Sequence, residues 1–287
     1  MTDAECVAFL QDALPRMGLR WPGFRRVRRQ VCKRIARRMH GLGLARIDDY
    51  RARLEREPGE WAVLEGMCHI PISRFFRDRG VFDLLGESVL PRLAEAALRR
   101  GAAELRVWSA GCASGEEPYS LSILWRMSLA RLFPALSLRI VATDADEGLI
   151  ARMRRGCYRP GSLRELPSGW TAAAFAPGPA GLCIRPEFRA GIDIALQDIR
   201  AALPEGRFDL VLCRNVAFTY LGEEAQRDCL ARIAACLWPG GCLVVGGHES
   251  LPQGQTAFAP WNGRREIFVL QDEAARQRVP PLAARVE

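Results

Sequence analysis

The stretch Leu105-Arg-Val-Trp-Ser-Ala-Gly111-Cys-Ala-Ser-Gly115-Glu-Glu-Pro-Tyr119 decides the fold. It starts as an apolar run typical of a buried strand, passes through a turn with two glycines, and restarts as a helix near Pro118. The glycines let backbone pass close to a ligand where a side chain would collide. The acidic pair Glu116-Glu117 stands where a phosphate-binding loop would carry a lysine or a free helix N-terminus. The pattern therefore favours a cationic or hydroxyl-rich ligand over a pyrophosphate.

S-adenosylmethionine has these properties, because it carries a sulfonium, an amino group and a ribose diol. A Gly-x-x-x-Gly turn also occurs in ordinary strand–helix connections without a ligand. The residues that follow in the chain have to decide between these two interpretations.

Strand-like runs alternate with helical patterns after residue 76, which predicts an α/β fold. Such alternation is typical of a parallel sheet covered on both faces, with ligands at the carboxyl ends of its strands. Asn262-Gly263 predicts a hairpin turn, so the last strand, 266–270, is expected to be antiparallel. The expected strands are 105–109, 138–142, 192–196, 208–213 and 241–246, and the expected helices between them are 118–132, 148–155 and 223–237.

The chain divides by pattern into a small all-helical N-terminal domain, residues 1–75, and an α/β domain, residues 76–271. Within the second domain, residues 157–190 contain too many prolines and glycines for a crossover helix, so they are expected to form an inserted small module. Residues 272–287 are polar, contain Pro280-Pro281, and are expected to form a disordered tail.

Composition excludes several classes of protein. No apolar run approaches the ~18 residues needed to span a bilayer, and the N-terminus does not resemble a signal peptide. The ten cysteines form no Cys-x-x-Cys pair, and the chain has only three histidines, so no metal site is expected. Scattered cysteines in a chain of this size indicate reduced core residues in a cytoplasmic protein.

The net charge of +8 is concentrated near the N-terminus, where the segment 13–47 holds eleven Arg or Lys residues and no acid. Residues 24–40 place apolar side chains at spacings of three and four, which predicts a helix with one apolar stripe and a basic opposite face. That face could dock on an acidic partner or could simply be solvated. Nucleic acid is a less favoured partner, because exposed aromatic residues are not interleaved with the charges.

Polar residues follow four successive predicted strands. Glu117 follows the first and Asp144 the second, where an acid can accept hydrogen bonds from a ribose diol. Asp198 follows the third, in position to meet an adenine amino group, and Asn215 follows the fourth. A single polar residue of this kind is usually a solvated loop residue, but four in one arrangement predict a nucleoside site.

Seven blocks of this sequence resemble the CheR-type chemotaxis-receptor methyltransferases. The resemblance covers about residues 15–270, and it implies a class I Rossmann-like methyltransferase sheet behind an all-helical N-terminal domain. It also implies that S-adenosylmethionine is the methyl donor, that S-adenosylhomocysteine is the product, and that receptor glutamates are the acceptors. The blocks are Phe75-Phe-Arg-Asp78, Val107-Trp-Ser-Ala-Gly-Cys-Ala-Ser-Gly-Glu-Glu-Pro-Tyr-Ser120, Ala142-Thr-Asp-Ala-Asp146, Gly156-Cys-Tyr158, Phe208-Asp-Leu-Val-Leu-Cys-Arg-Asn-Val216, Trp238-Pro-Gly-Gly241 and Gly247-His248.

Carried over residue by residue, the resemblance assigns roles to particular side chains. Arg77 would approach both donor and acceptor, Glu117 would bind the amino group of the donor, and Asp144 would hold its ribose. The implied cofactor-binding residues are Ser73, Arg77, Ala110, Gly111, Glu117, Asp144, Asp198, Ile199 and Asn215, and the implied catalytic residues are Arg77, Asn215 and Tyr220.

Three departures from the family pattern lie on the acceptor side. The family's polar set before Phe75 is reduced to Ser73 of Ile70-Pro-Ile-Ser73, Thr219 stands where a tyrosine is usual, and Gly-His-Ser-Glu has become Gly247-His-Glu-Ser250. Two acceptor classes therefore stay open, carboxylates of a receptor-like protein and a small molecule. A non-catalytic adaptor is the third alternative, and the presence of Glu117, Asp144 and Asn215 argues against it.

Overall fold

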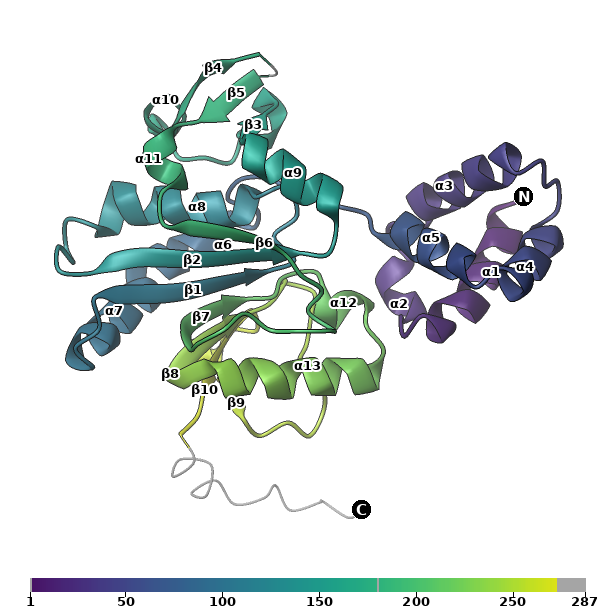
Figure 1. Cartoon of the computed structure of the whole chain (residues 1–287). Coiled ribbons are helices and arrows are strands. Elements are labelled where there is room, and N and C mark those ends of the chain that lie inside the picture. The colour runs from purple at the N-terminus through teal and green to yellow at the C-terminus, as the bar shows by residue number, and fades with distance from the viewer. Residues whose placement is uncertain (1, 180, 273–287) are drawn as a thin grey trace. The chain divides into compact units, whose positions relative to one another are not determined.

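The computed structural model describes residues 2–179 and 181–272, and its chain divides into two compact units (Figure 1). The helical unit comprises the residues up to Ile72 together with Thr219–Gln226. The sheet unit comprises Ser73–Phe218 and the residues from Arg227 on. The expected disordered tail falls, beyond residue 272, outside the described residues.

The helical unit is built from short helices that bury one apolar face each. In the basic segment, Val31, Ile35 and Met39 are buried, as their spacing predicts. The helix expected over 24–40 begins at Arg28 and not at Phe24. Phe24 instead ends a separate short helix that has Pro22 in its first turn. The helices are α1 (Asp3–Arg16), α2 (Trp21–Phe24), α3 (Arg28–Gly41), α4 (Ile47–Arg56) and α5 (Gly59–Cys68).

A buried carboxylate, Glu60, links three helices of this unit. Its oxygens accept two hydrogen bonds from Arg38, at 2.9 and 2.7 Å, and one from the hydroxyl of Tyr50 at 2.9 Å. The hydrogen bond from Arg38, together with that from Tyr50, lowers the pKa of Glu60 although burial acts in the opposite direction.

The main sheet of the sheet unit has seven strands in the order β6-β2-β1-β7-β8-β10-β9. The first five are parallel, β10 is antiparallel to β8, and β9 is antiparallel to β10. This confirms the predicted mostly parallel sheet with an antiparallel last strand. The strands are β1 (Glu104–Ala110), β2 (Ser137–Asp144), β6 (Ile192–Leu196), β7 (Phe208–Leu212), β8 (Leu237–Val244), β9 (Phe258–Pro260) and β10 (Ile267–Leu270).

The centre of the sheet is covered on both faces. All five residues of β7 are buried. Four of them are apolar, and the fifth, Asp209, forms an ion pair with Arg100. Asn262 and Gly263, between β9 and β10, both have positive φ, as the predicted hairpin turn requires. Figure 1 shows the strands and the helices around them, which are α6 (Arg79–Leu84), α7 (Leu90–Arg99), α8 (Glu116–Leu124), α9 (Glu147–Arg155), α12 (Ala217–Tyr220) and α13 (Glu223–Cys236).

Two π-helical turns lie in the helices whose bounds are predicted least well from the sequence. The turn η1 (Leu85–Val89) joins α6 to α7, and η2 (Trp125–Leu129) continues α8. A π turn shifts the 3.6-residue period of apolar side chains. The spacing of apolar residues therefore does not reveal the helical segment 79–99, and the helix predicted from Pro118 to residue 132 is too long at its C-terminal end.

Residues 157–190 form a small three-stranded antiparallel sheet in the order β3-β5-β4. Figure 1 shows this small module beyond α8 and α9. Its elements are β3 (Cys157–Tyr158), η3 (Pro160–Ser162), α10 (Trp170–Ala174), β4 (Phe175–Gly178), β5 (Gly181–Ile184) and α11 (Pro186–Arg189).

The expectation that all ten cysteines are reduced core residues is wrong for four of them. Disulfides join Cys6 to Cys32 and Cys157 to Cys183. Linear spacing could not show this, because the first pair bridges α1 and α3 and the second pair consists of register partners on β3 and β5. The other six are buried free thiols. The cytoplasmic location expected from cysteine usage stays a prediction.

Replacing Glu60 with glutamine is expected to lower the free energy of unfolding by about 2 kcal/mol at pH 7, because hydrogen bonds to a charged acceptor are lost or weakened. The pKa of Glu60 is lowered in the folded state, so its contribution is present above its ordinary value of 4.5 and is lost as pH falls below it. Urea titrations of the full chain at pH 7, 5 and 4 should show a difference from wild type that narrows only at the lowest pH.

Glu95→Gln is the matched control, because Glu95 lies in an exposed ion pair with Arg99 and should contribute less than about 0.5 kcal/mol. A Glu60→Gln difference that stays the same at all three pH values would contradict the assignment.

Candidate functional site

The carboxyl ends of the parallel strands bring the predicted site residues of the sheet unit to one edge. The carbonyl of Thr143, near the end of β2, accepts hydrogen bonds from the N–H groups of Gly111 and Cys112 at 2.8 and 2.9 Å. The carbonyl of Asp144 accepts from the N–H of Gln197, after β6, at 2.9 Å. The loops after β1, β2 and β6 are therefore joined, next to the point where the strand order reverses beside β1.

The loop after β1 has an unusual backbone. Gly111, Ala113 and Gly115 all have positive φ. A Cβ on Gly111 would lie 2.4 Å from a methyl group of Val216, and one on Gly115 would lie 2.4 Å from Cγ of Met153. The glycines are thus required by close packing within the protein, in addition to the backbone freedom that the sequence indicated.

Asp144 fixes this loop in place. Its Oδ2 accepts a hydrogen bond from the N–H of Ala113 at 2.8 Å, and its Oδ1 accepts from the N–H of Asp146 at 3.0 Å. Two backbone donors orient the carboxylate at the end of β2, where the sequence predicts the ribose of the cofactor.

Glu117, in the first turn of α8, is held by two partners. Its Oε1 accepts from the hydroxyl of Ser109 at 2.8 Å, and its Oε2 accepts from Arg214 at 3.1 Å. These bonds leave part of the acceptor capacity of a carboxylate unused, so the oriented group can still accept a hydrogen bond from an ammonium group.

Arg214 is a site residue that sequence reasoning missed. Its side chain is 3% exposed. Its guanidinium donates to Asp78 at 2.7 Å, to the carbonyl of Arg77 at 2.9 Å and to Glu117, and it lies over the ring of Phe82. The one available signal was its place directly before Asn215, because no local pattern reveals partners so far away in the chain.

The side chains of Arg77 and Asn215, two of the residues that the resemblance implies are catalytic, meet in the structure. A guanidinium nitrogen of Arg77 donates to Oδ1 of Asn215 at 3.3 Å. Phe75 and Phe76 anchor the segment before Arg77, because both are buried and their N–H groups donate to Ser162 and Ser120.

The remaining predicted residues are distributed as follows. Ala110 is buried at the end of β1, Ser73 is half-buried in the segment that leads to Phe75, and Ile199 is buried. Asp198 follows β6, as predicted, and its carboxylate binds the guanidinium of Arg200. Tyr220 belongs to the helical unit, where its ring packs against that of Phe24 with centroids 4.9 Å apart.

The small module contacts the loop after β1 through Tyr158. The hydroxyl of Tyr158 donates to the carbonyl of Ser114 at 2.6 Å, and its ring meets that of Phe75 edge-on at 4.8 Å. Burial raises the pKa of Tyr158, so its hydroxyl stays protonated and remains a donor.

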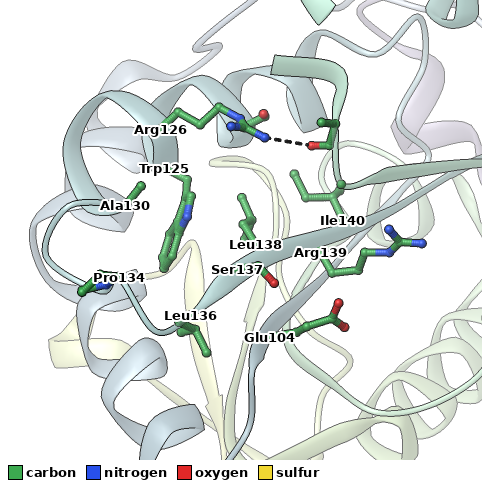
Figure 2. Close-up of a pocket in the computed structure, with 13 residues that line it drawn as sticks. Glu104, Trp125, Arg126, Ala130, Pro134, Leu136, Ser137, Leu138, Arg139 and Ile140 are labelled. Atoms are coloured by element: carbon green, nitrogen blue, oxygen red, sulfur yellow. Dashed lines mark hydrogen bonds between the residues drawn. The ribbon is translucent and has the colours of Figure 1, made fainter. Parts of the chain in front are cut away.

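A cavity of about 410 Å³ lies at the opposite end of the sheet (Figure 2). It opens near Glu104 and Ser137, where β1 and β2 begin, and Trp125 and Leu138 lie along its walls. None of the predicted site residues lines it, so this cavity is distinct from the candidate cofactor site.

Among the described residues, no helix combines the length and the apolar character needed to cross a membrane. Within the same residues, no group of three or more His, Cys, Asp or Glu side chains could hold a metal ion.

The residues at this site fit S-adenosylmethionine as a ligand. Backbone and side-chain donors hold the carboxylates of Glu117 and Asp144 at neighbouring strand ends, and these groups suit an ammonium group and a ribose diol. The fold and the site define a Rossmann-like methyltransferase.

Comparison with known proteins agrees with this class. Residues 72–267 match the family model described as CheR methyltransferase, SAM binding domain. A chemotaxis protein methyltransferase of Escherichia coli is 31% identical over 251 residues, with 81% of this chain and 82% of that protein covered. Chemotaxis protein methyltransferase 1 of Pseudomonas aeruginosa is 33% identical, with 77% and 81% covered. The chain therefore belongs to the CheR methyltransferase family and is an S-adenosylmethionine-dependent methyltransferase.

This chain spans only part of the length of some other relatives. An uncharacterized 104.1 kDa protein of Rhodobacter capsulatus is 34% identical over 256 residues, which are 89% of this chain but 26% of that protein. The chain also covers 66% of a chemotaxis protein methyltransferase of Listeria innocua, to which it is 37% identical.

Replacing Asp144 with alanine should weaken the binding of S-adenosylhomocysteine roughly a hundredfold, because charge-assisted hydrogen bonds are lost and the loop after β1 is released. Calorimetric titration of the folded variant measures the change. Asp193→Ala, which removes an exposed acid from the neighbouring strand β6, is the control and should bind like wild type. An unchanged affinity in Asp144→Ala would mean that the ribose is bound elsewhere.

Tyr158→Phe should weaken S-adenosylhomocysteine binding about three- to tenfold, because the carbonyl of Ser114 loses its donor and the cofactor loop loosens. Tyr119→Phe is the matched control, since the Tyr119 hydroxyl is also buried but donates to Met153 at the end of α9. Calorimetry measures the affinity of each variant for S-adenosylhomocysteine, and thermal unfolding measures its stability. Both variants should lose similar stability, and equal losses of affinity would refute a specific role for Tyr158.

Proposed function

We propose that this enzyme methylates carboxylates, namely glutamate side chains of a receptor-like protein. The observation that carries the proposal is the 3.3 Å contact between the guanidinium of Arg77 and the amide of Asn215. It places a planar cation, able to bind a carboxylate with two parallel hydrogen bonds, at the end of β7 beside the residues that suit the methyl donor.

The chemistry needs few functional groups. When bound, S-adenosylmethionine supplies a methyl group whose S–C bond breaks as the carboxylate oxygen forms the new O–C bond, and the electron pair stays on sulfur. A glutamate side chain is already ionised at neutral pH, so no general base is required. Arg77 would orient the carboxylate, Asn215 would hold Arg77, and the surrounding side chains would exclude water from the attacking oxygen.

The basic face of the helical unit supports an acidic protein partner. Five cations on or just before α3 are exposed, and none of them makes an ion pair within the described part of the chain. Arg29, Lys33 and Arg37 are spaced by four residues, so they form one line along α3. This line of positive charges, called the basic stripe below, would attract an acidic helix from a distance. The five are Arg25, Arg26, Arg29, Lys33 and Arg37.

The second candidate acceptor is a small molecule. It is favoured by the replacements on the acceptor side, Ile70-Pro71, Thr219 and Glu249-Ser250, which remove polar groups expected there or alter their order. Under this alternative the basic stripe on α3 would have no part in turnover.

The deciding experiment measures transfer of a tritiated methyl group to a helical peptide rich in glutamate pairs. Label that is released as volatile methanol at alkaline pH would identify a methyl ester. We expect such label on the glutamate peptide and none on a peptide with alanine at the paired positions. Transfer to small carboxylic acids, with none to the peptide, would instead establish the small-molecule acceptor.

A charge-reversal variant, Arg29→Glu/Lys33→Glu/Arg37→Glu, separates docking from chemistry. It should raise the KM for the peptide at least about tenfold at low salt, since electrostatic attraction is replaced by repulsion. The affinity for S-adenosylhomocysteine should not change. An unaltered KM would remove the basic stripe from the proposal.

A further inference from the structure

The carboxylate of Glu249 is buried between the two loops that follow β7 and β8. Glu249 is 8% exposed, and it lies in the turn that follows β8. Its Oε2 accepts from the N–H of Gly246 at 2.5 Å and from the N–H of Asn215 at 2.7 Å. Gly246 and Asn215 follow neighbouring parallel strands, so one oxygen atom ties the ends of β7 and β8 together.

The backbone that Glu249 binds is in an unfavourable conformation. Asn215 has φ of 57°, a left-handed value that residues other than glycine adopt seldom and at a cost. Such a conformation persists when surrounding bonds determine it, and the bond from the Asn215 N–H to Glu249 fixes the peptide group that enters this residue.

The side chain of Asn215 is confined as well. A Cβ on Gly246 would come within 2.8 Å of Oδ1 of Asn215 and within 2.9 Å of Oε2 of Glu249. The absence of a side chain at position 246 therefore lets the amide and the carboxylate lie against the same backbone. In this arrangement Oδ1 accepts the hydrogen bond from Arg77.

A charged acceptor suits this role better than a neutral one. Hydrogen bonds from backbone N–H groups to a carboxylate oxygen are charge-assisted, and they are stronger than the same bonds to a neutral oxygen. Removing it would leave the N–H groups of Gly246 and Asn215 without this acceptor, in a place where water is largely excluded.

We infer that Glu249 is a positioning residue, which acts through Asn215 to present the Asn215 amide to Arg77 and to the cofactor. The inference rests on the proposed function of Asn215 and Arg77, but it does not depend on which acceptor is methylated. It gives the order Glu249-Ser250, noted above only as a departure from the family pattern, a physical role.

A double-mutant cycle tests the inference with S-adenosylhomocysteine as the probe. Glu249→Ala should weaken binding about tenfold in the wild-type background. In the background of Asn215→Gly, which removes the amide while glycine tolerates the positive φ, the same change should cost less than about twofold. A cost that is the same in both backgrounds would show that Glu249 only stabilises the fold, and it would overturn the inference.

Two further variants sharpen the cycle. Glu249→Gln keeps one oxygen in place and should stay within about threefold of wild type, while Ser250→Ala, at an exposed neighbour, should not differ from it. If Glu249→Gln binds as weakly as Glu249→Ala while both remain folded, acceptance of the two N–H bonds is not the role of this side chain.

The readout also separates this inference from the proposed function. Coupling in the binding cycle together with no transfer to the glutamate peptide would leave Glu249 as a positioning residue and reject the peptide acceptor. Methyl transfer to the peptide without coupling in the binding cycle would support the peptide acceptor and reject Glu249 as a positioning residue.

Discussion

The site depends on the hydrogen bonds of one buried group, the guanidinium of Arg214. It binds Asp78, the carbonyl of Arg77 and Glu117, and so joins the segment that leads into α6 to the first turn of α8. A buried charge is costly unless it is paired and hydrogen-bonded, and removing one partner of such a pair leaves the other uncompensated. The three contacts of Arg214 therefore stabilise one another. They also fix the main chain of Arg77, whose side chain reaches Asn215.

Backbone strain is concentrated around the same residues. Five described residues other than glycine have positive φ, and four of them, Phe76, Asp78, Ala113 and Asn215, lie in the loops that form the site. Each is held by a specific bond. The N–H of Phe76 donates to Ser120, Asp78 accepts from Arg214, and the N–H groups of Ala113 and Asn215 donate to carboxylates. Strained residues persist where their surroundings determine them, so this pattern indicates a site whose geometry is fixed by contacts within the protein.

The sequence predicted what local chemistry determines. Apolar runs bounded by glycine or by acidic residues located the strands of the sheet, and their order along the chain implied that Asp144, Asp198 and Asn215 follow strands at one edge. Partners distant in the chain could not be predicted in this way. Arg214 lies 136 residues from Asp78 and 97 from Glu117, and nothing in the spacing of residues indicates either pair. Cys157 and Cys183 are likewise joined by strand register, which a list of cysteine positions does not contain.

The residues of the candidate cofactor site say little about the identity of the methyl acceptor. Because a carboxylate is already ionised at neutral pH, its methylation needs orientation and exclusion of water, and no side chain that accepts a proton. A proton-accepting side chain at the cofactor site would therefore not be expected for a carboxylate acceptor. What distinguishes a protein glutamate from a small carboxylic acid is then where the rest of the acceptor binds. The exposed line of Arg29, Lys33 and Arg37 would offer an extended acidic helix a contact surface that a small molecule could not use, and this is the ground on which we propose a protein acceptor.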